Sequence, residues 1–512
     1  MSRSRRFISD VSWSLGGQIG LALVNITVIP TMIRGLGVEG YGLYILLNSA
    51  ASYLPALSLG AGSATVKYLS EHEGAGEGRA MRDILRVGML MHFATAALGG
   101  AMLWALAPRL AATFLRASGA QSADVILVLH AATLGGVFLS CSLWAQAALQ
   151  GLRRFDLQNF LAVTQGVLMP LGALSLMAYA HGVVAISWWY AALNAVFFLI
   201  GATLVLRQVA ALPADGPRAN IRSFLLFGLS LCPGPLAWIV SSQVDKLFVL
   251  RVQQLTSLTL YAVPMSALQR LQVLPASVAA VLLPTLSAAS RDESGETLRR
   301  IYSRVVRIML TLLWPAYALL FAFMPQLLSL WLGGRFGDDS VWPARLLVVG
   351  QAFGVMAYVP NSVVIGIGRP MFSPILSWIQ AGLSLLLWIL LVPRWGILGA
   401  AAGAAAGQAL PALAYAAFVQ AKFLGLDWRR FLADCLVIPF TSSGTLLAAA
   451  MLLHPLGSTW SRLFILGSAG GLLCYGLVWR LLSIEDRELA ISILNRREKK
   501  SIKTNGLDER IC

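Results

Sequence analysis

The sequence predicts an all-α polytopic membrane protein, and three observations lead to this fold class. Hydrophobic residues make up 57% of the 512 residues and charged residues only 12%, whereas soluble domains carry about 25% charged residues. The mean hydropathy is +0.73. The chain also runs fifty residues, 157–206, without a single Asp, Glu, Lys or Arg. Because about 20 apolar residues cross a bilayer as a helix, this run predicts two crossings joined by a turn.

Charged residues and turn-forming residues divide the chain into about 14 predicted transmembrane helices. Their approximate ranges are 8–33, 41–66, 85–108, 124–150, 157–180, 183–206, 223–250, 255–287, 305–332, 343–366, 371–393, 396–421, 432–453 and 461–483. The first range follows a short basic segment and has no small-residue cleavage pattern, so we expect a retained span and not a removed signal sequence.

The distribution of basic residues predicts which side of the membrane each loop faces. With the N-terminus in the cytoplasm, 29 of the 39 Lys and Arg residues fall on the cytoplasmic side, nine fall on the other side, and Arg270 lies inside a helix. A miscounted helix would invert this alternation further along the chain, and no sustained inversion occurs. We therefore expect both termini in the cytoplasm. The net charge of +16 is spread between apolar spans, which argues against a nucleic-acid partner.

A segment after the first predicted helix recurs 217 residues later. Residues 34–44 read Arg-Gly-Leu-Gly-Val-Glu-Gly-Tyr-Gly-Leu-Tyr, and their counterpart is residues 251–261, again between two apolar helices. Six helices separate the copies, so both halves have the same orientation, and such a parallel repeat predicts a substrate path between them. The alternative is chance similarity between two interfacial Arg/Tyr anchors, because the second copy lacks the glycines of the first.

Prolines are frequent in the four predicted helices that flank the two copies of the repeat. They are Pro30, Pro55, Pro233, Pro235, Pro264, Pro275 and Pro284. Proline bends a helix and frees a backbone carbonyl, which is tolerated in a membrane where protein or a watery cavity covers it. We expect these four helices to form the cavity walls, with kinking that serves no function as the alternative.

Four motifs carry a family resemblance. They are residues 34–44, residues 150–159 (Gln-Gly-Leu-Arg-Arg-Phe-Asp-Leu-Gln-Asn), Phe227-Gly228 together with Asp245-Lys246, and residues 361–370, which end Gly-Ile-Gly-Arg-Pro. In these motifs and in its hydropathy the chain resembles the polysaccharide-type flippases of the multidrug/oligosaccharidyl-lipid/polysaccharide exporter superfamily. The resemblance implies export of an undecaprenyl-pyrophosphate-linked oligosaccharide, as in O-antigen or exopolysaccharide assembly.

The resemblance also implies two six-helix lobes related by the parallel repeat, followed by two additional C-terminal helices. The expected boundaries are 1–206 for the N-terminal lobe, 207–421 for the C-terminal lobe, 422–483 for the two additional helices and 484–512 for a charged cytoplasmic tail.

Arg270 and Asp245 are the two charged residues predicted to lie well inside helices. A guanidinium at the bilayer centre costs roughly 2.5–3.5 kcal/mol even on the lenient insertion scale, so Arg270 should face a cavity. There it could bind a pyrophosphate through paired N–H donors; the alternative is an anchor at the membrane interface. Asp245 is a candidate ion-coupling site or a partner for Arg270, unless its side chain reaches the outer interface.

Three further basic residues lie at the mouths of the proposed path, where they could gather an anionic headgroup. They are Arg34, Lys67 and Arg304, and the alternative for each is an anchor that sets helix orientation. We find no paired acid/base carboxylates, nucleophile motif or P-loop, and the five cysteines are too far apart for a zinc site. The sequence thus predicts no catalytic residues, metal or cofactor, and no enzyme.

The function predicted from these observations is a multi-pass flippase of the bacterial inner membrane that moves a lipid-linked oligosaccharide by alternating access. Membrane lipid and other polysaccharide assembly proteins are the expected partners. A multidrug or cation antiporter of the same superfamily is the first alternative, although it would need an acidic cavity. A membrane glycan polymerase or glycosyltransferase would need large external loops, and the predicted loops are short. A scaffold without transport activity is the last alternative.

Overall fold

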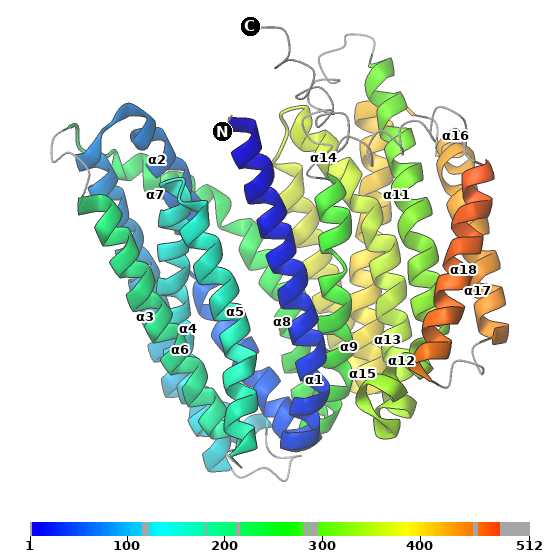
Figure 1. The fold of residues 1–512 in the computed structure, drawn as a ribbon, viewed down its shortest axis with the longest axis horizontal. Coiled ribbons are helices and arrows are strands. Elements are labelled where there is room, and N and C mark those ends of the chain that lie inside the picture. Colours follow the sequence, from blue (N-terminus) through cyan, green and yellow to red (C-terminus); the bar gives the residue numbers. More distant parts are fainter. Residues whose placement is uncertain are drawn as a thin grey trace, which may run out of the picture. The chain divides into compact units, whose positions relative to one another are not determined.

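The computed structural model describes most of the chain, and every regular element in the described part is a helix (Figure 1). The described residues are 3–114, 122–179, 182–210, 216–279, 286, 295–426, 428–453 and 459–481. The predicted all-α class is thereby confirmed. The predicted tail 484–512 lies outside the described residues.

The chain divides into two compact units. Unit 1 comprises Met1–Arg270 and Ser377–Ala404, and unit 2 comprises Leu271–Leu376 and Ala405–Cys512. The division into lobes at residue 206 stays a prediction.

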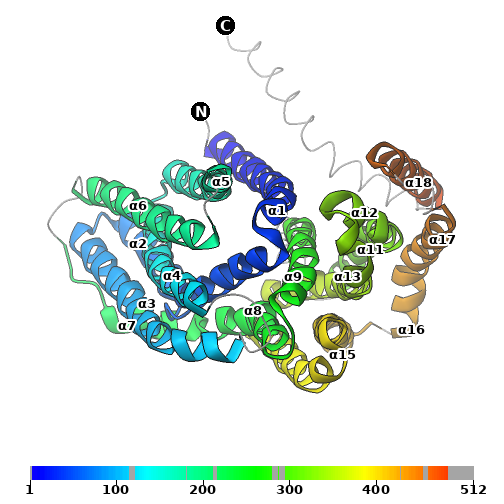
Figure 2. The same cartoon turned by 90° about the horizontal axis from the view of Figure 1, so that it is seen from below.

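Unit 1 is a helix bundle. Its helices are α1 (Arg3–Ala56), α2 (Ala61–Ala75), α3 (Gly78–Phe114), α4 (Ser122–Gly151), α5 (Phe155–Ala178), α6 (Val183–Ala210), α7 (Ile221–Leu231), α8 (Pro233–Val252), α9 (Leu255–Arg270) and the middle part of α15 (Phe372–Val419). In the view of Figure 2, α4 lies between α3 and α6. Helices α2 to α7 enclose a buried apolar core that includes Leu69, Trp144, Leu161 and Phe197.

Unit 2 is a second all-helical body. Its helices are α11 (Glu296–Ala322), α12 (Met324–Leu332), α13 (Gly334–Gly354), α14 (Tyr358–Gly366), the two ends of α15, α16 (Trp428–Phe431), α17 (Val437–Leu453) and α18 (Trp460–Leu481). A 3-10 turn at Val355–Ala357 and π-helical turns at Gln420–Leu424 and Leu432–Leu436 connect some of them. Helix α11 packs against α17, and Ala322, Phe323 and Ala450 form a small buried cluster there.

The described residues contain eight helices that are long and apolar enough to cross a membrane, or up to nine if the bent pair α1–α2 is one span. The protein is therefore a multi-pass membrane protein. The number of fourteen crossings stays a prediction.

Several helices that the sequence predicts to be continuous are divided in the structure, among them 305–332, which is divided at Phe323 between α11 and α12. The predicted helix 41–66 is interrupted at residues 57–60, and α1 and α2 meet there at a bend of 47°. The predicted helix 223–250 is divided at Cys232, and the predicted helix 255–287 is interrupted at residues 271–272. Proline explains the last two breaks, because its ring excludes the hydrogen bond to the carbonyl four residues earlier. Pro233 follows the first of them, and Pro275 lies four residues after Leu271.

Two long helices are each interrupted at a glycine. Helix α1 joins the predicted helices 8–33 and 41–66 through Gly37 (φ 73°, ψ 170°), and α15 joins 371–393 and 396–421 through Gly396 (φ 55°, ψ −128°). Only glycine adopts such angles without strain. Each glycine thus marks the turn that the sequence predicts between the two spans.

The turn that precedes α2 packs directly against α7. Gly60 has a φ of 73°, and a Cβ atom built on it would collide with the backbone carbonyl of Gly228. Gly76, at the other end of α2, has nearly the same φ of 72° but open space around its Cα. Substitutions at both glycines carry the free-energy cost of the positive φ angle, but only a substitution at Gly60 also carries the cost of the close approach to α7.

We expect Gly60→Ala to destabilise unit 1 more than Gly76→Ala does, by about 1–3 kcal/mol, because only Gly60→Ala overpacks the contact with α7. The midpoint of thermal unfolding in detergent measures both variants against the unaltered protein. Equal midpoints for the two variants would contradict the close approach of α2 and α7.

Candidate functional site

The two copies of the sequence repeat contact each other inside unit 1. The Thr259 hydroxyl donates a hydrogen bond of 2.8 Å to the backbone carbonyl of Val38. A Cβ atom on Gly42 would lie 2.7 Å from the backbone carbonyl of Leu255. The 217-residue shift converts Val38 into Leu255 and Gly42 into Thr259, so the two contacts are equivalent under the repeat. Such reciprocity is what a twofold relation produces, and it supports the predicted parallel repeat.

Arg270 ends α9 at the break before Leu271, which corrects the expectation that it lies midway along a continuous helix. Its side chain is half-buried, and its Nε atom is buried without a hydrogen-bond partner among the described residues. The aromatic hydroxyls of Tyr41 and Tyr44, both on α1, are its electrostatic neighbours. Arg270 therefore ends α9 with an unpaired Nε atom and interacts electrostatically with two tyrosines of the first repeat copy.

Asp245 is fully buried in α8. The Tyr261 hydroxyl of α9 donates a hydrogen bond of 2.7 Å to its Oδ2 atom, and its Oδ1 atom has no partner among the described residues. The burial excludes the alternative in which the Asp245 side chain reaches the outer interface. In the described part of the chain no ion pair joins Asp245 to Arg270, so the structure does not show the alternative in which Asp245 is a partner for Arg270.

Lys246 and Tyr53 surround the same part of α8. The Lys246 ammonium donates to Gln243 Oε1 at 2.5 Å and makes no ion pair with Asp245. The Tyr53 hydroxyl of α1 donates to the Gln243 backbone carbonyl at 3.2 Å. Helix α1 thus contacts α8 through Tyr53 and approaches the end of α9 through Tyr41 and Tyr44.

Two of the other predicted site residues, Lys67 and Arg34, lie in unit 1, and neither is an electrostatic neighbour of Arg270. Lys67 is exposed on α2, 3.8 Å from the Glu71 carboxylate and 4.1 Å from the Phe227 ring centre. Arg34 is exposed on α1, with no ion pair in the described part of the chain. Arg304 is half-buried on α11 and belongs to unit 2. The contacts of Lys67 are those of an anchor on α2.

Sequence reasoning missed the tyrosines that surround Arg270 and Asp245. The repeat contained a signal for two of them, because Tyr44 and Tyr261 are equivalent under the 217-residue shift and so are Tyr53 and Arg270. The shift thus relates Tyr44, an electrostatic neighbour of Arg270, to Tyr261, which donates the hydrogen bond to Asp245.

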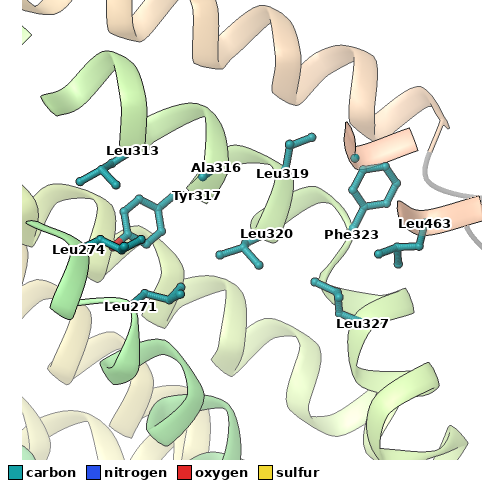
Figure 3. A pocket seen from close by; sticks show the side chains of 11 residues that line it. Leu271, Leu274, Leu313, Ala316, Tyr317, Leu319, Leu320, Phe323, Leu327 and Leu463 are labelled. Atoms are coloured by element: carbon teal, nitrogen blue, oxygen red, sulfur yellow. The ribbon is translucent and has the colours of Figure 1, made fainter. Parts of the chain in front are cut away.

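An apolar pocket of about 330 Å³ lies in unit 2, between the segment after α9, α11, the start of α12 and α18 (Figure 3). Its lining residues are Leu271, Leu274, Leu313, Ala316, Tyr317, Leu319, Leu320, Phe323, Leu327, Leu463 and Gly467. The lining is hydrocarbon apart from the Tyr317 hydroxyl. Such a surface can hold a hydrocarbon chain and offers no site for a charged group.

The described residues contain no group of three or more His, Cys, Asp or Glu side chains that could hold a metal ion.

Comparison with known proteins identifies a matching family model and a relative. A family model described as "Polysaccharide biosynthesis protein" matches residues 83–340, just over half of the chain. A Shigella flexneri protein named "Putative O-antigen transporter" is 20% identical over 396 residues, which cover 77% of this chain and 93% of that protein.

Two solved structures share the fold. One is the lipid II flippase MurJ in an inward closed conformation, with a TM-score of 0.67 and 13% identity over 92% of this chain and 99% of that chain. The other is an inward-facing multidrug resistance transporter of the MATE family of the MOP superfamily, with a TM-score of 0.61 and 16% identity over 81% of this chain and 95% of that chain. The named relatives are transporters or flippases, and none is an enzyme.

We expect Tyr261→Phe to lower the free energy of unfolding by about 1–3 kcal/mol, because it leaves both oxygens of the buried Asp245 without a donor. Tyr68→Phe is the control, since the Tyr68 ring packs edge-on against Phe224 and Phe227 while its hydroxyl makes no hydrogen bond in the described part of the chain. Thermal unfolding midpoints in detergent compare the two. An equal loss in both variants would argue against the bond from Tyr261 to Asp245.

Proposed function

Because the chain belongs to the family of polysaccharide biosynthesis proteins that its residues 83–340 match, we propose that it is a flippase for an undecaprenyl-pyrophosphate-linked oligosaccharide. The family resemblance read from the sequence motifs is confirmed by this match. The proposed substrate is an O-antigen or exopolysaccharide repeat unit, and the proposed location is the bacterial inner membrane with both termini in the cytoplasm. Transport proceeds by alternating access.

Arg270 is the observation that carries this proposal. A half-buried guanidinium whose Nε atom lacks a partner among the described residues is costly within an apolar bundle, unless a ligand of opposite charge neutralises it part of the time. A pyrophosphate fits this role, because its oxygens accept paired N–H donors in the planar geometry of guanidinium. The hydroxyls of Tyr41 and Tyr44, which interact electrostatically with Arg270, are further candidate donors to a phosphorylated headgroup.

The polyprenyl part of the substrate needs a hydrocarbon environment. The apolar pocket of unit 2 can provide one, because its lining has no charged residue. Burial of each methylene group contributes roughly 0.8 kcal/mol, so a pocket of this size can hold a few isoprene units with useful affinity. The tail otherwise stays in lipid while the headgroup moves.

Energy for transport comes from an ion gradient or the membrane voltage, since the described residues and the sequence contain no P-loop for ATP. Moving one elementary charge across 100 mV contributes about 2.3 kcal/mol. Asp245 is the proposed coupling residue, because its Oδ1 atom is buried without a partner and can take up a proton or a cation.

A cation or drug antiporter of the same superfamily is the second candidate, and the buried Asp245 is the observation that favours it. The two functions differ in substrate. In a strain that lacks the gene, loss of the flippase leads to accumulation of lipid-linked repeat units on the cytoplasmic face and loss of surface glycan. Loss of an antiporter leaves the glycan intact and raises drug sensitivity, and that result would exclude the flippase.

We expect Arg270→Ala to reduce glycan export at least about tenfold, because it removes charge-assisted hydrogen bonds to the pyrophosphate. Arg270→Lys keeps the charge but loses the planar pair of donors. Its glycan export should therefore lie between that of Arg270→Ala and that of the unaltered protein. Complementation of the deletion strain measures export, and immunoblotting of membranes checks that each variant is inserted.

Arg207→Ala is the control for this series, since Arg207 is an exposed residue near the end of α6. Its export should equal that of the unaltered protein. Full export by inserted Arg270→Ala would remove Arg270 from the substrate site.

We expect Asp245→Asn to abolish the dependence of transport on an imposed ion gradient. The amide oxygen still accepts the hydrogen bond from Tyr261, so the fold is retained, but the neutral group cannot bind a proton or cation in exchange for substrate. Transport of a lipid-linked oligosaccharide in proteoliposomes, with and without a gradient, checks this. An Asp245→Asn variant that responds to the gradient as the unaltered protein does would assign coupling to another group.

A further inference from the structure

A second cavity, of about 430 Å³, lies in unit 1 away from Arg270 and Asp245, and its lining is strongly basic. Its lining residues are Arg79, Arg82, Asp83, Arg86, Arg218, Ala219 and Ile221. Four guanidinium groups therefore face one carboxylate. The cavity is formed by the first turns of α3 and by the segment that leads into α7, near the end of the unit at which α1 begins (Figure 1).

The sequence of α3 gathers the arginines on one face. Arg79, Arg82 and Arg86 are spaced three and four residues apart, which places their side chains one above the other on a helix. Like charges at this spacing destabilise an isolated helix. Arg79, Arg86 and Arg218 make no ion pair or hydrogen bond within the described part of the chain. An anion in the cavity would relieve this repulsion.

The same face of α3 continues into hydrocarbon. Leu90 lies one turn after Arg86 and is 64% exposed, and Phe93 follows with 51% of its surface exposed. Helix α3 is a candidate membrane span from Gly78 to Ala112, so these exposed apolar side chains face lipid. A ligand with a phosphate in the cavity can extend an acyl chain along this face, whereas a free phosphate gains nothing from it.

We propose that this cavity binds the phosphate of an anionic membrane lipid, whose acyl chains lie along the exposed apolar face of α3. A basic pocket at the end of a membrane helix, on the side predicted to be cytoplasmic, has the charge and the position for this ligand. Planar guanidinium groups bind phosphate oxygens in pairs, and the clustered arginines supply several such groups. The site does not depend on the proposed transport function.

Binding of phosphatidylglycerol to the purified full chain in detergent, measured by native mass spectrometry, tests the proposal. Phosphatidylcholine is the zwitterionic comparison, and inorganic phosphate is the soluble competitor. The double variant R79Q/R86Q should bind phosphatidylglycerol about thirtyfold more weakly, because each Arg near an anionic lipid contributes roughly a fivefold gain in affinity. R218Q should bind phosphatidylglycerol about fivefold more weakly. Because Arg218 lies outside any helix, this variant replaces the double variant if the latter is unstable.

The control R207Q/R300Q removes the same number of charges from exposed residues that do not line the cavity. It should bind phosphatidylglycerol as the unaltered protein does. Three results would overturn the proposal: an equal loss in the control, unchanged binding in both R79Q/R86Q and R218Q, or displacement of phosphatidylglycerol by millimolar inorganic phosphate. Preference for phosphatidylglycerol over phosphatidylcholine that disappears in the cavity variants alone supports it.

Discussion

The hydrocarbon core of a membrane offers no water to polar groups, so each polar side chain and each interrupted backbone in this bundle must find its partner within the protein. Two buried amide side chains of unit 1 meet this requirement together. Gln165 donates to Asn194 at 2.8 Å, and Asn194 donates to the backbone carbonyl of Tyr190 at 2.8 Å. These amides hold α5 and α6 together without exposing a polar atom.

Against this background the exceptions are informative. Asp245 keeps one oxygen unpaired although its side chain is fully buried, and the Arg270 Nε atom is also unpaired among the described residues. Several other buried polar atoms also lack a hydrogen-bond partner among the described residues, including the amide oxygens of Gln253, Asn361 and Gln420. Asp245 and Arg270 differ from these amides because their side chains can carry a charge, for which burial without a partner costs more. The helix breaks contribute to the same arrangement, because the interruption that begins at Leu271 ends α9 at Arg270.

The sequence predicted the helical class correctly, because charged residues and glycines interrupt the apolar runs clearly, while the number of fourteen crossings stays a prediction. It singled out Arg270 and Asp245 as candidates for the same reason, since a charge inside an apolar run is conspicuous. The sequence did not predict the break at residues 271–272 or the role of Tyr261, because no single residue indicates either. Pro275 indicated a break four residues earlier, but a helix can also continue through a proline, so the interruption at residues 271–272 required coordinates. Tyr261 is one of 12 tyrosines, and nothing in its own sequence context distinguishes the donor to Asp245 from a tyrosine at the membrane interface.

The two repeat copies make reciprocal contacts with each other, but the equivalent residues in these contacts differ chemically. Thr259 supplies a hydroxyl, whereas its equivalent, Gly42, has no side chain and no room for one. A slip of α1 by one residue would move Tyr41 or Leu43 against the Leu255 carbonyl, which has room for neither. The contact between the two repeat copies therefore allows only one register of α1 against α9. Tyr41 and Tyr44 lie on the same helix as Gly42, and Arg270 lies on the same helix as Thr259. The contact between α1 and α9 therefore also fixes where these three side chains lie relative to one another.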